Sequence, residues 1–263
     1  MSNFTGTDFW EYIYNQFTSE VYIDTDPILF PKTYSGNIEF IGLVASLFAY
    51  GRVSSIQAFL KDFFHHYGTD PFFIKTFNSR LYYRFQNAYD IQVLLEFLVD
   101  IYKKYGSFEN FFRYISLNLE DALSGFLNMA SEFGCCKGAG KGYFFLFPSY
   151  GKSGLKRLRM FLRWMVRKDS IDFGLWKNYS SAMLTYPIDT HILRFGLNFG
   201  VLTNDSNSHR NALKITRYFK SINPDDPVKY DFAITRLGML NRCIFTNSRA
   251  CENCSISGKC IFN

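Results

Sequence analysis

Residues 187–199, Pro-Ile-Asp-Thr-His-Ile-Leu-Arg-Phe-Gly-Leu-Asn-Phe, contain the clearest helix start in the chain. Pro187 disfavours a helical conformation for the residue before it, and aspartate is a preferred residue at a helix N-cap. Apolar side chains then recur at the spacing of a buried helical face, at Ile192, Phe195 and Phe199. The pattern predicts a helix that begins at Asp189, where backbone amides and the helix dipole favour an ionised carboxylate. An N-cap aspartate alone indicates only a structural role, so other stretches decide whether Asp189 does more.

Composition indicates a globular protein with a large core. The chain has 263 residues, 19% of them aromatic, enough for one large domain or two closely packed halves. Its longest apolar run, near residues 41–50, is too short to span a bilayer, and its first residues lack the features of a signal peptide. We therefore expect a cytoplasmic protein with no membrane contact. The net charge of +6 is compatible with a polyanionic partner but does not require one.

Apolar periodicity predicts an all-α fold. Helical patterns occupy residues 9–17, 39–50, 56–64, 82–88, 91–105, 108–119, 155–168 and 230–240. The alternation typical of β-strands does not persist anywhere in the chain. Between the helices, Asp24 and Asp26 precede Pro27 in a stretch typical of a turn. The corner at Gly51 follows a buried helix, and a glycine there allows a backbone or a flat ring to approach closely.

Residues 155–168 predict a helix with two distinct faces. Its apolar stripe consists of Leu155, Leu158, Leu162 and Met165. Its basic stripe, with the residue just before the helix, consists of Lys152, Lys156, Arg159, Arg163 and Arg167. A glycine-containing turn at residues 148–154 leads into the helix, an arrangement of backbone amides that binds anions. The stripe is interpreted either as a solvated face or as a set of phosphate contacts to nucleic acid.

Four cysteines near the C-terminus indicate a metal centre. Their spacing is C-x7-C-x2-C-x5-C, at Cys243, Cys251, Cys254 and Cys260. In a chain without a secretion signal, clustered cysteines favour a metal or iron–sulfur site over disulfides. The loop has too few apolar side chains to form a core of its own, so a bound metal centre would hold it in one conformation. Four thiolates suit either a [4Fe–4S] cluster or structural zinc, and the spacing does not choose between them.

These three features together resemble the helix-hairpin-helix DNA glycosylases of the endonuclease III type. That group carries a G-x-G-x-K hairpin, a V-D-T-H helix start and a terminal C-x6-C-x2-C-x5-C loop, in the same order. The similarity to these glycosylases is confined to the motifs. Blocks at residues 49–53, 158–168, 187–191 and 226–232 are similar to a bacterial family of unknown function, distantly related to the glycosylases, over nearly the whole chain.

The resemblance implies roles for individual residues. Asp189 matches the catalytic aspartate, and Lys156 matches the lysine that forms a Schiff base in members with lyase activity. Gly154 matches the second hairpin glycine, whereas Lys152 stands where the first would be. His191 matches the helix-start motif, and we expect it to be structural. The residues expected to contact DNA are Lys152, Ser153, Gly154, Arg157, Arg159 and Arg163.

The resemblance also implies an architecture and an activity. We expect two interdigitated helical halves: a barrel over residues 38–186 with the hairpin-like turn, and a terminal half of residues 1–37 plus 187–263 with a [4Fe–4S] loop. Structural zinc remains the alternative. The active site would lie in the cleft between the halves. The expected function is base excision from duplex DNA by a monomeric glycosylase, with or without lyase activity.

A second function from a different class stays open. A non-catalytic nucleic-acid-binding protein could retain the fold and the cluster after losing excision, and the altered hairpin glycine favours that alternative. The retained Asp189 and Lys156 favour the enzyme. The sequence also leaves RNA or modified nucleotides open as substrates.

Overall fold

The computed structural model describes residues 6–77, 80–246, 249–257 and 260–261, and its regular elements are helices. The α-helices are α1 (Gly6–Phe17), α2 (Leu29–Thr33), α3 (Ile38–Leu47), α4 (Val53–Tyr67), α5 (Ala88–Tyr105), α6 (Phe108–Ile115), α7 (Leu119–Lys137), α8 (Lys141–Leu146), α9 (Lys156–Val166), α10 (Thr190–Asn198), α11 (His209–Lys220) and α12 (Asp231–Leu240). Short 3-10 helices lie at Glu20–Tyr22, Pro71–Phe73, Ser181–Met183 and Arg249–Asn253. Within these ranges β-structure is limited to isolated bridges, so the predicted all-α class is confirmed. None of the described helices has the length and apolar character needed to cross a bilayer.

Several helices begin at a polar cap that the sequence supplies. Asn87 and Asp90 form a capping box at α5, Ser107 caps α6, and Asn118 caps α7. Each of these side-chain oxygens accepts a hydrogen bond from an amide that has no partner within its helix. Asp189 does the same at α10, which confirms the helix start predicted there.

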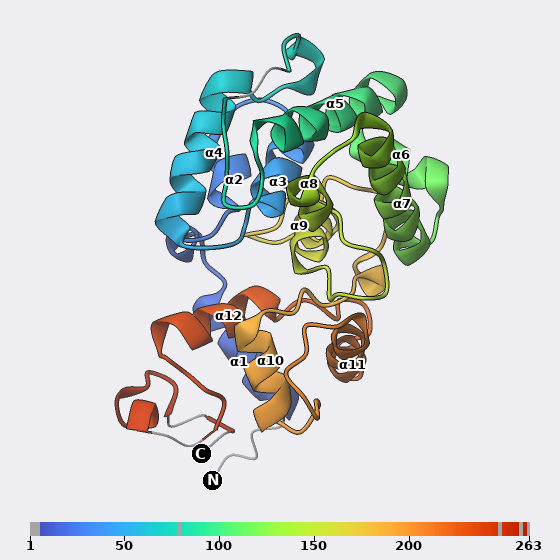
Figure 1. The fold of residues 1–263 in the computed structure, drawn as a ribbon. Helices are drawn as coiled ribbons and strands as arrows, with labels where there is room; N and C mark the ends of the chain where they lie inside the picture. Colours follow the sequence, from blue (N-terminus) through green and yellow to red (C-terminus); the bar gives the residue numbers. More distant parts are fainter. Residues whose placement is uncertain (1–5, 78–79, 247–248, 258–259, 262–263) are drawn as a thin grey trace.

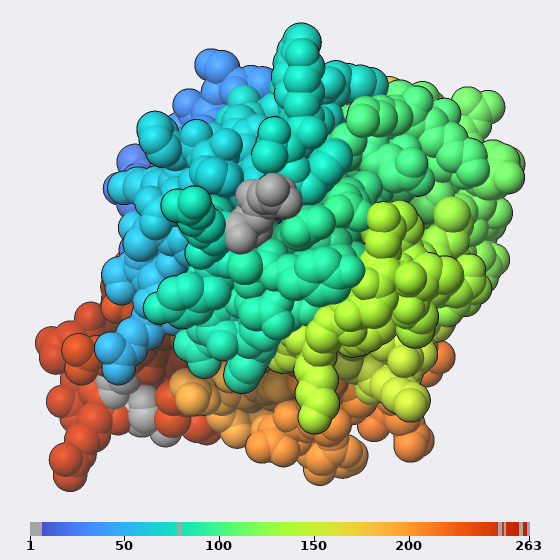
Figure 2. Space-filling model, turned by 45° about the horizontal axis from the view of Figure 1, so that its top comes forward, coloured from blue at the N-terminus to red at the C-terminus, as the bar shows by residue number. Residues whose placement is uncertain are grey.

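The helices form two groups (Figure 1). The central group contains α2 to α9, and the terminal group contains α1, α10, α11 and α12. The first helix reaches the terminal group because α1 packs against α12, which also contacts α10. Helix α2, which precedes residue 38, packs against α3 of the central group. Figure 2 shows the orange and red terminal elements lying along one edge of the central group.

Helix α9 lies where the two groups meet. All of its residues from Leu158 to Val166 are buried, and it packs against α3, which is itself buried from Phe40 to Leu47. A helix this deeply buried carries three arginines, Arg159, Arg163 and the neighbouring Arg167, that are each less than 5% exposed. Buried charges are costly unless they are paired, so each needs a carboxylate partner.

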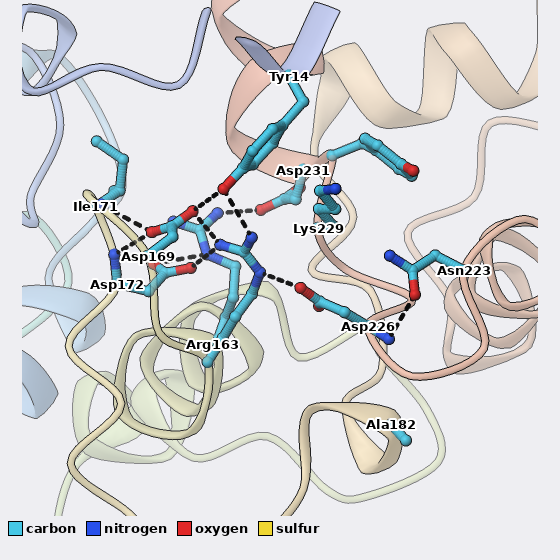
Figure 3. Close-up of polar contacts among 12 residues, drawn as sticks. Tyr14, Arg163, Asp169, Ile171, Asp172, Ala182, Asn223, Asp226, Lys229 and Asp231 are labelled. Carbon is cyan, nitrogen blue, oxygen red and sulfur yellow. Dashed lines mark hydrogen bonds and ion pairs between the residues drawn. The ribbon is translucent and has the colours of Figure 1, made fainter. Parts of the chain in front are cut away.

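Arg163 and Arg167 obtain those partners partly from the segment that follows α9 and partly from the terminal group (Figure 3). Arg163 pairs with Asp172 at 3.2 Å and with Asp231, the first residue of α12. Arg167 pairs with Asp172 at 2.9 Å and with Asp226 at 2.7 Å. The ion pairs therefore join α9 of the central group to α12 and the segment before it.

Asp169 and Tyr14 extend this network to the first helix. Asp169 pairs with Arg167, and its Oδ2 accepts a hydrogen bond of 2.9 Å from the hydroxyl of Tyr14 on α1. Burial alone would lower the pKa of Arg167, but the surrounding carboxylates, led by Asp172, raise it well above its usual value. We call Arg163, Arg167 and their four aspartates the arginine network.

Glu120, near the start of α7, anchors the other end of α9. Its carboxylate accepts hydrogen bonds from both Nη atoms of Arg159, at 2.5 and 3.0 Å. It also accepts bonds of 2.6 Å from the hydroxyls of Thr185 and Tyr150. Burial alone would raise the pKa of Glu120, but the Arg159 guanidinium and these donors lower it to about 2.

The predicted helix over residues 82–88 is wrong. Tyr83 and Gln86 instead exchange backbone hydrogen bonds of 2.9 and 2.8 Å in a tight turn, with Arg84 in the left-handed conformation at φ 50°. The hydroxyl of Tyr83 donates to the carbonyl oxygen of Tyr50. This tertiary contact with the corner after α3 outweighs the local apolar pattern.

Replacement of Arg163 by methionine should destabilise the fold strongly. Arg163→Met removes the guanidinium that pairs with both Asp172 and Asp231 and leaves these carboxylates buried. Breaking a buried pair in this way costs about 3–5 kcal/mol. Urea unfolding measures the change in the free energy of unfolding. The matched control is Arg217→Met on the exposed face of α11, which should change stability by less than about 0.5 kcal/mol. Equal effects of the two variants would contradict the structural role of the arginine network.

Glu120 should make stability depend on pH in the acid range. Because its pKa is lowered on folding, its contribution is complete above about pH 4.5 and is lost as the pH falls towards 2. The stability gap between the wild type and Glu120→Gln should therefore narrow over that range. Denaturant midpoints measured between pH 5 and 2.5 test this. Glu132→Gln, an exposed position on the same helix, should show little gap at any pH.

Candidate active site

A cavity of about 760 Å³ lies between the central and terminal groups. The corner after α3, the end of α8 and the first turn of α9 form one wall, and α10 and α12 form the other. Apolar lining comes from residues such as Phe145 and Leu193, and charged lining from Lys156, Arg157 and Asp189. Cavities of this size bind small organic groups in a mostly apolar setting with a few polar contacts.

Asp189 lines the cavity at the start of α10. Its Oδ1 accepts hydrogen bonds from the amides of His191 and Ile192, both at 2.9 Å. The side chain is 13% exposed, so the carboxylate is largely shielded from water. Two backbone donors hold this carboxylate in one orientation, with its other oxygen directed to Lys156.

Lys156 is the first residue of α9 and faces Asp189 across the cavity. Its Nζ lies 3.6 Å from Oδ2 of Asp189, which is an ion-pair distance slightly beyond a hydrogen bond. The Lys156 side chain is 36% exposed. Two residues from distant parts of the chain thus come together at the same site.

Arg157 is held in the cavity wall by carbonyl oxygens and aromatic rings. Its Nη1 donates to the carbonyl oxygen of Leu47 at 2.8 Å, and its Nη2 donates to that of Phe145. The guanidinium lies 4.6 Å from the ring centre of Phe145 and 5.2 Å from that of Tyr50. Burial lowers the pKa of Arg157 to about 10, the effect being partly offset by Tyr50.

The turn before α9 uses its backbone differently from the expected anion-binding hairpin. The amide of Gly154 donates to the carbonyl oxygen of Asn207 at 3.1 Å, and that of Leu155 donates to Oγ of Ser153. A side chain at Gly154 would also clash, because its Cβ would stand 2.4 Å from Oδ1 of Asn207. Gly154 and Ser153 therefore shape the turn, while Lys152 is exposed on it.

The amide groups available to a ligand lie instead in the first turn of α9. Its N-cap, Leu155, has a left-handed backbone at φ 52° and provides no side-chain cap. Within the described part of the chain, the amides of Lys156, Arg157 and Leu158 have no acceptor. Uncapped amides at a helix N-terminus attract anions.

Two residues predicted to contact DNA are placed elsewhere. Arg159 is 2% exposed and pairs with Glu120, and Arg163 is 4% exposed and pairs with Asp172 and Asp231. The prediction that they contact phosphate is wrong because their charges are used inside the protein. The basic stripe thus reaches the surface only at its N-terminal end, where Lys152 is exposed and Lys156 is partly exposed.

The cavity also contains residues that the sequence did not single out as a site. Asp26 keeps its predicted turn role, since its Oδ1 accepts from the amide of Ile28, but its Oδ2 also pairs with Arg236 at 2.5 Å. At the corner, Gly51 has φ 101°, and a Cβ there would stand 2.7 Å from the guanidinium of Arg84. The close approach predicted at Gly51 is confirmed. No periodic signal could have paired Asp26 with Arg236.

His191 faces both the cavity and the interior of the terminal group. It packs against Gly238 of α12, where a Cβ would stand 2.3 Å from its Nδ1. Burial lowers the pKa of His191, despite the nearby carboxylate of Asp189, so the imidazole is neutral at neutral pH. Its Nδ1 is buried, and no residue in the described ranges forms a hydrogen bond with it. These contacts fit the structural role expected for it.

The four cysteines of the C-terminal loop lie in one part of the fold. The pKa of the Cys243 thiol is raised to about 11, first by burial and also by the nearby charges of Cys260, Cys254 and Cys251. Amide donors face two of the sulfurs: Asn241 Nδ2 lies 3.4 Å from Cys254 Sγ, and the Phe245 amide lies 3.3 Å from Cys243 Sγ. In the ranges described, no three Cys, His, Asp or Glu side chains are close enough to hold a metal ion.

Comparison with known proteins gives one match. A family model described as "Protein of unknown function (DUF2400)" matches residues 26–240, which include the arginine network and the cavity lining apart from Thr25, but not the cysteine loop. No curated protein matches the chain, and no solved structure matches it. Because the match covers most of the chain, the protein belongs to the DUF2400 family.

Proposed function

We propose that this protein is a DNA glycosylase that removes a damaged base from duplex DNA. The observation that carries the proposal is the meeting of Lys156 and Asp189 across a cavity of about 760 Å³. A base-excision enzyme must rotate a nucleotide out of the helix into such a pocket. It must also place a carboxylate beside the sugar, and Asp189 is positioned to do so.

Asp189 would stabilise the positive charge that develops on the sugar. When the bond between C1′ and the base nitrogen breaks, the electron pair leaves with the base and the sugar becomes an oxocarbenium-like cation. A fixed carboxylate lowers the energy of that cation because it needs no reorientation during the reaction. The two amide donors to Oδ1 provide this fixed position.

Lys156 would have a different role in each of two versions of the reaction, one with and one without lyase activity. In the lyase version its neutral amine bonds to C1′ as the bond between C1′ and the base breaks and its electron pair leaves with the base. The C1′–O4′ bond then opens, the amine proton passes to O4′, and a Schiff base forms with the opened sugar. In the monofunctional version water attacks C1′ and gives its proton to the departing base or to solvent, and Lys156 remains the partner of Asp189. The lyase version requires that Nζ of Lys156 carry a free electron pair when it attacks C1′.

Duplex binding would depend on the surface around the first turn of α9. Lys152 is exposed on the preceding turn, and the amides of residues 156–158 lack a cap. These groups suit contacts to phosphate oxygens, which position DNA without reading its sequence. This footprint is smaller than the basic stripe suggests, because Arg159 and Arg163 are buried.

We also propose that Cys243, Cys251, Cys254 and Cys260 hold a [4Fe–4S] cluster. Support comes from the chemistry of the donor set, four thiols within one short stretch of sequence, and from the amide donors of Asn241 and Phe245 that face two of the sulfurs. When bound, the cluster would order the loop. The catalytic residues proposed above do not depend on it chemically.

Replacement of Asp189 by asparagine should abolish excision without unfolding the protein. Asparagine is an equally good N-cap, so stability and DNA affinity should be kept, while the loss of negative charge should lower the excision rate about a hundredfold or more. Single-turnover assays on a panel of damaged duplexes measure the rate. Asp205→Asn, an exposed position, is the matched control. Undiminished excision by Asp189→Asn would remove Asp189 from the mechanism.

Borohydride trapping on the same duplexes separates the two roles of Lys156. A trapped adduct in the parent protein that disappears in Lys156→Gln, but persists in the exposed control Lys220→Gln, supports the lyase version. Base release without an adduct supports the monofunctional version. If the parent protein binds damaged duplexes but cuts none, the non-catalytic binding function replaces the enzyme.

The cysteine loop should yield a brown protein on anaerobic purification. The sample should contain iron and acid-labile sulfide at about four of each per chain. Cys254→Ser should lose both, whereas Cys136→Ser, an exposed cysteine at the end of α7, should keep them. One zinc ion per chain in place of iron would overturn the iron–sulfur proposal.

A further inference from the structure

The charges that line the cavity do not balance. Asp26 is paired with Arg236, and Asp189 is paired with Lys156, so two carboxylates neutralise two cations. His191 adds no charge, because burial keeps its imidazole neutral at neutral pH. Arg157 remains as the unpaired cation, since the described residues provide it with no carboxylate.

The guanidinium of Arg157 has donors to spare. Arginine carries five N–H groups in a planar fork, and here two of the nitrogens donate to the carbonyl oxygens of Leu47 and Phe145. In the part of the chain described, its other N–H groups have no acceptor. A group entering the cavity that presents oxygen acceptors would satisfy them, as arginine does when it reads a base edge.

The aromatic rings beside Arg157 are already occupied by cations. Arg157 lies over Tyr50 and Phe145, and Arg84 lies 5.7 Å from the ring centre of Tyr50. A positively charged base stacked on these rings would meet two guanidinium groups at close range. The attraction between cations and aromatic faces, which otherwise favours such bases, is therefore used within the protein.

We propose that the cavity selects neutral bases that present carbonyl oxygens, as oxidised and deaminated bases do, and rejects positively charged N-alkylated bases. Arg157 is the specificity-determining residue and donates to a carbonyl oxygen of the extruded base. The inference rests on the proposed glycosylase function and adds the class of substrate.

Arg157 also has a structural role, which the test must separate from recognition. Leu47 ends α3 and Phe145 lies in the last turn of α8, so Arg157 binds carbonyl oxygens at two helix C-termini. Loss of that role would weaken binding of every base equally. Loss of recognition would change the ratio of the binding affinities for different bases.

The experiment measures binding to duplexes that cannot be cleaved. Each duplex carries one 2′-fluoro nucleotide, with 8-oxoguanine as the neutral base, 7-methylguanine as the cationic base of similar size, or uracil as a neutral pyrimidine. The wild type should bind 8-oxoguanine and uracil at least about tenfold more tightly than 7-methylguanine. Arg157→Met should lose about tenfold to a hundredfold of that preference, the range for a hydrogen bond to a charged group. Arg157→Lys, which keeps the charge without the fork, should retain part of it, and Arg217→Met should retain it fully.

The outcomes distinguish this inference from the proposed function. A preference for the neutral bases over 7-methylguanine that depends on Arg157, without excision of the matching cleavable duplexes, would support the inference and overturn the enzyme. Excision confined to cationic bases would overturn the inference and leave the enzyme. A preference unchanged in a folded Arg157→Met protein would also overturn it. Wild-type indifference to base charge would overturn it whether or not Arg157→Met folds.

Discussion

The buried pairing of Arg163 and Arg167 with four aspartates is the constraint on which the arrangement of the two helical groups depends. The arginines come from α9, Asp169 and Asp172 from the segment that follows it, and Asp226 and Asp231 from the start of α12 and the residues before it. None of these charges can be left alone inside the protein, because a buried ion without its partner is strongly destabilising. Only one relative placement of α9 and α12 therefore satisfies all of them.

That placement also decides the geometry of the cavity. Helix α9 carries Lys156 and Arg157 at its first turn, and α12 packs against α10, which carries Asp189 at its start. Fixing α9 against α12 at one end thus sets the distance between Lys156 and Asp189 at the other. Glu120 contributes by holding Arg159, near the start of α9, to α7. The charges that stabilise the fold and those that face the cavity lie on the same helix, and only the latter are free to meet a ligand.

Helix starts and the all-α class could be predicted from the sequence because both depend on local chemistry. Asp189 caps α10 through amides two and three residues away, and the apolar spacing of its helix needs no distant partner. The resemblance to glycosylase motifs likewise brought Lys156 and Asp189 together as candidates, and the structure places them 3.6 Å apart. Gly51 was recognised as a point of close approach because glycine tolerates a backbone that other residues avoid.

Tertiary structure alone decided what each basic residue does. Along the sequence, Lys152, Lys156, Arg159 and Arg163 form one stripe with no feature to separate them. Their fates differ because Arg159 and Arg163 are buried against the carboxylates of Glu120, Asp172 and Asp231, whereas Lys156 meets Asp189 at the cavity and Lys152 is exposed. The same holds for residues 82–88, where a hydroxyl contact to the Tyr50 carbonyl oxygen outweighs the helical pattern. A local pattern records which side chains share a face, whereas burial and charge pairing depend on what the rest of the chain places against that face.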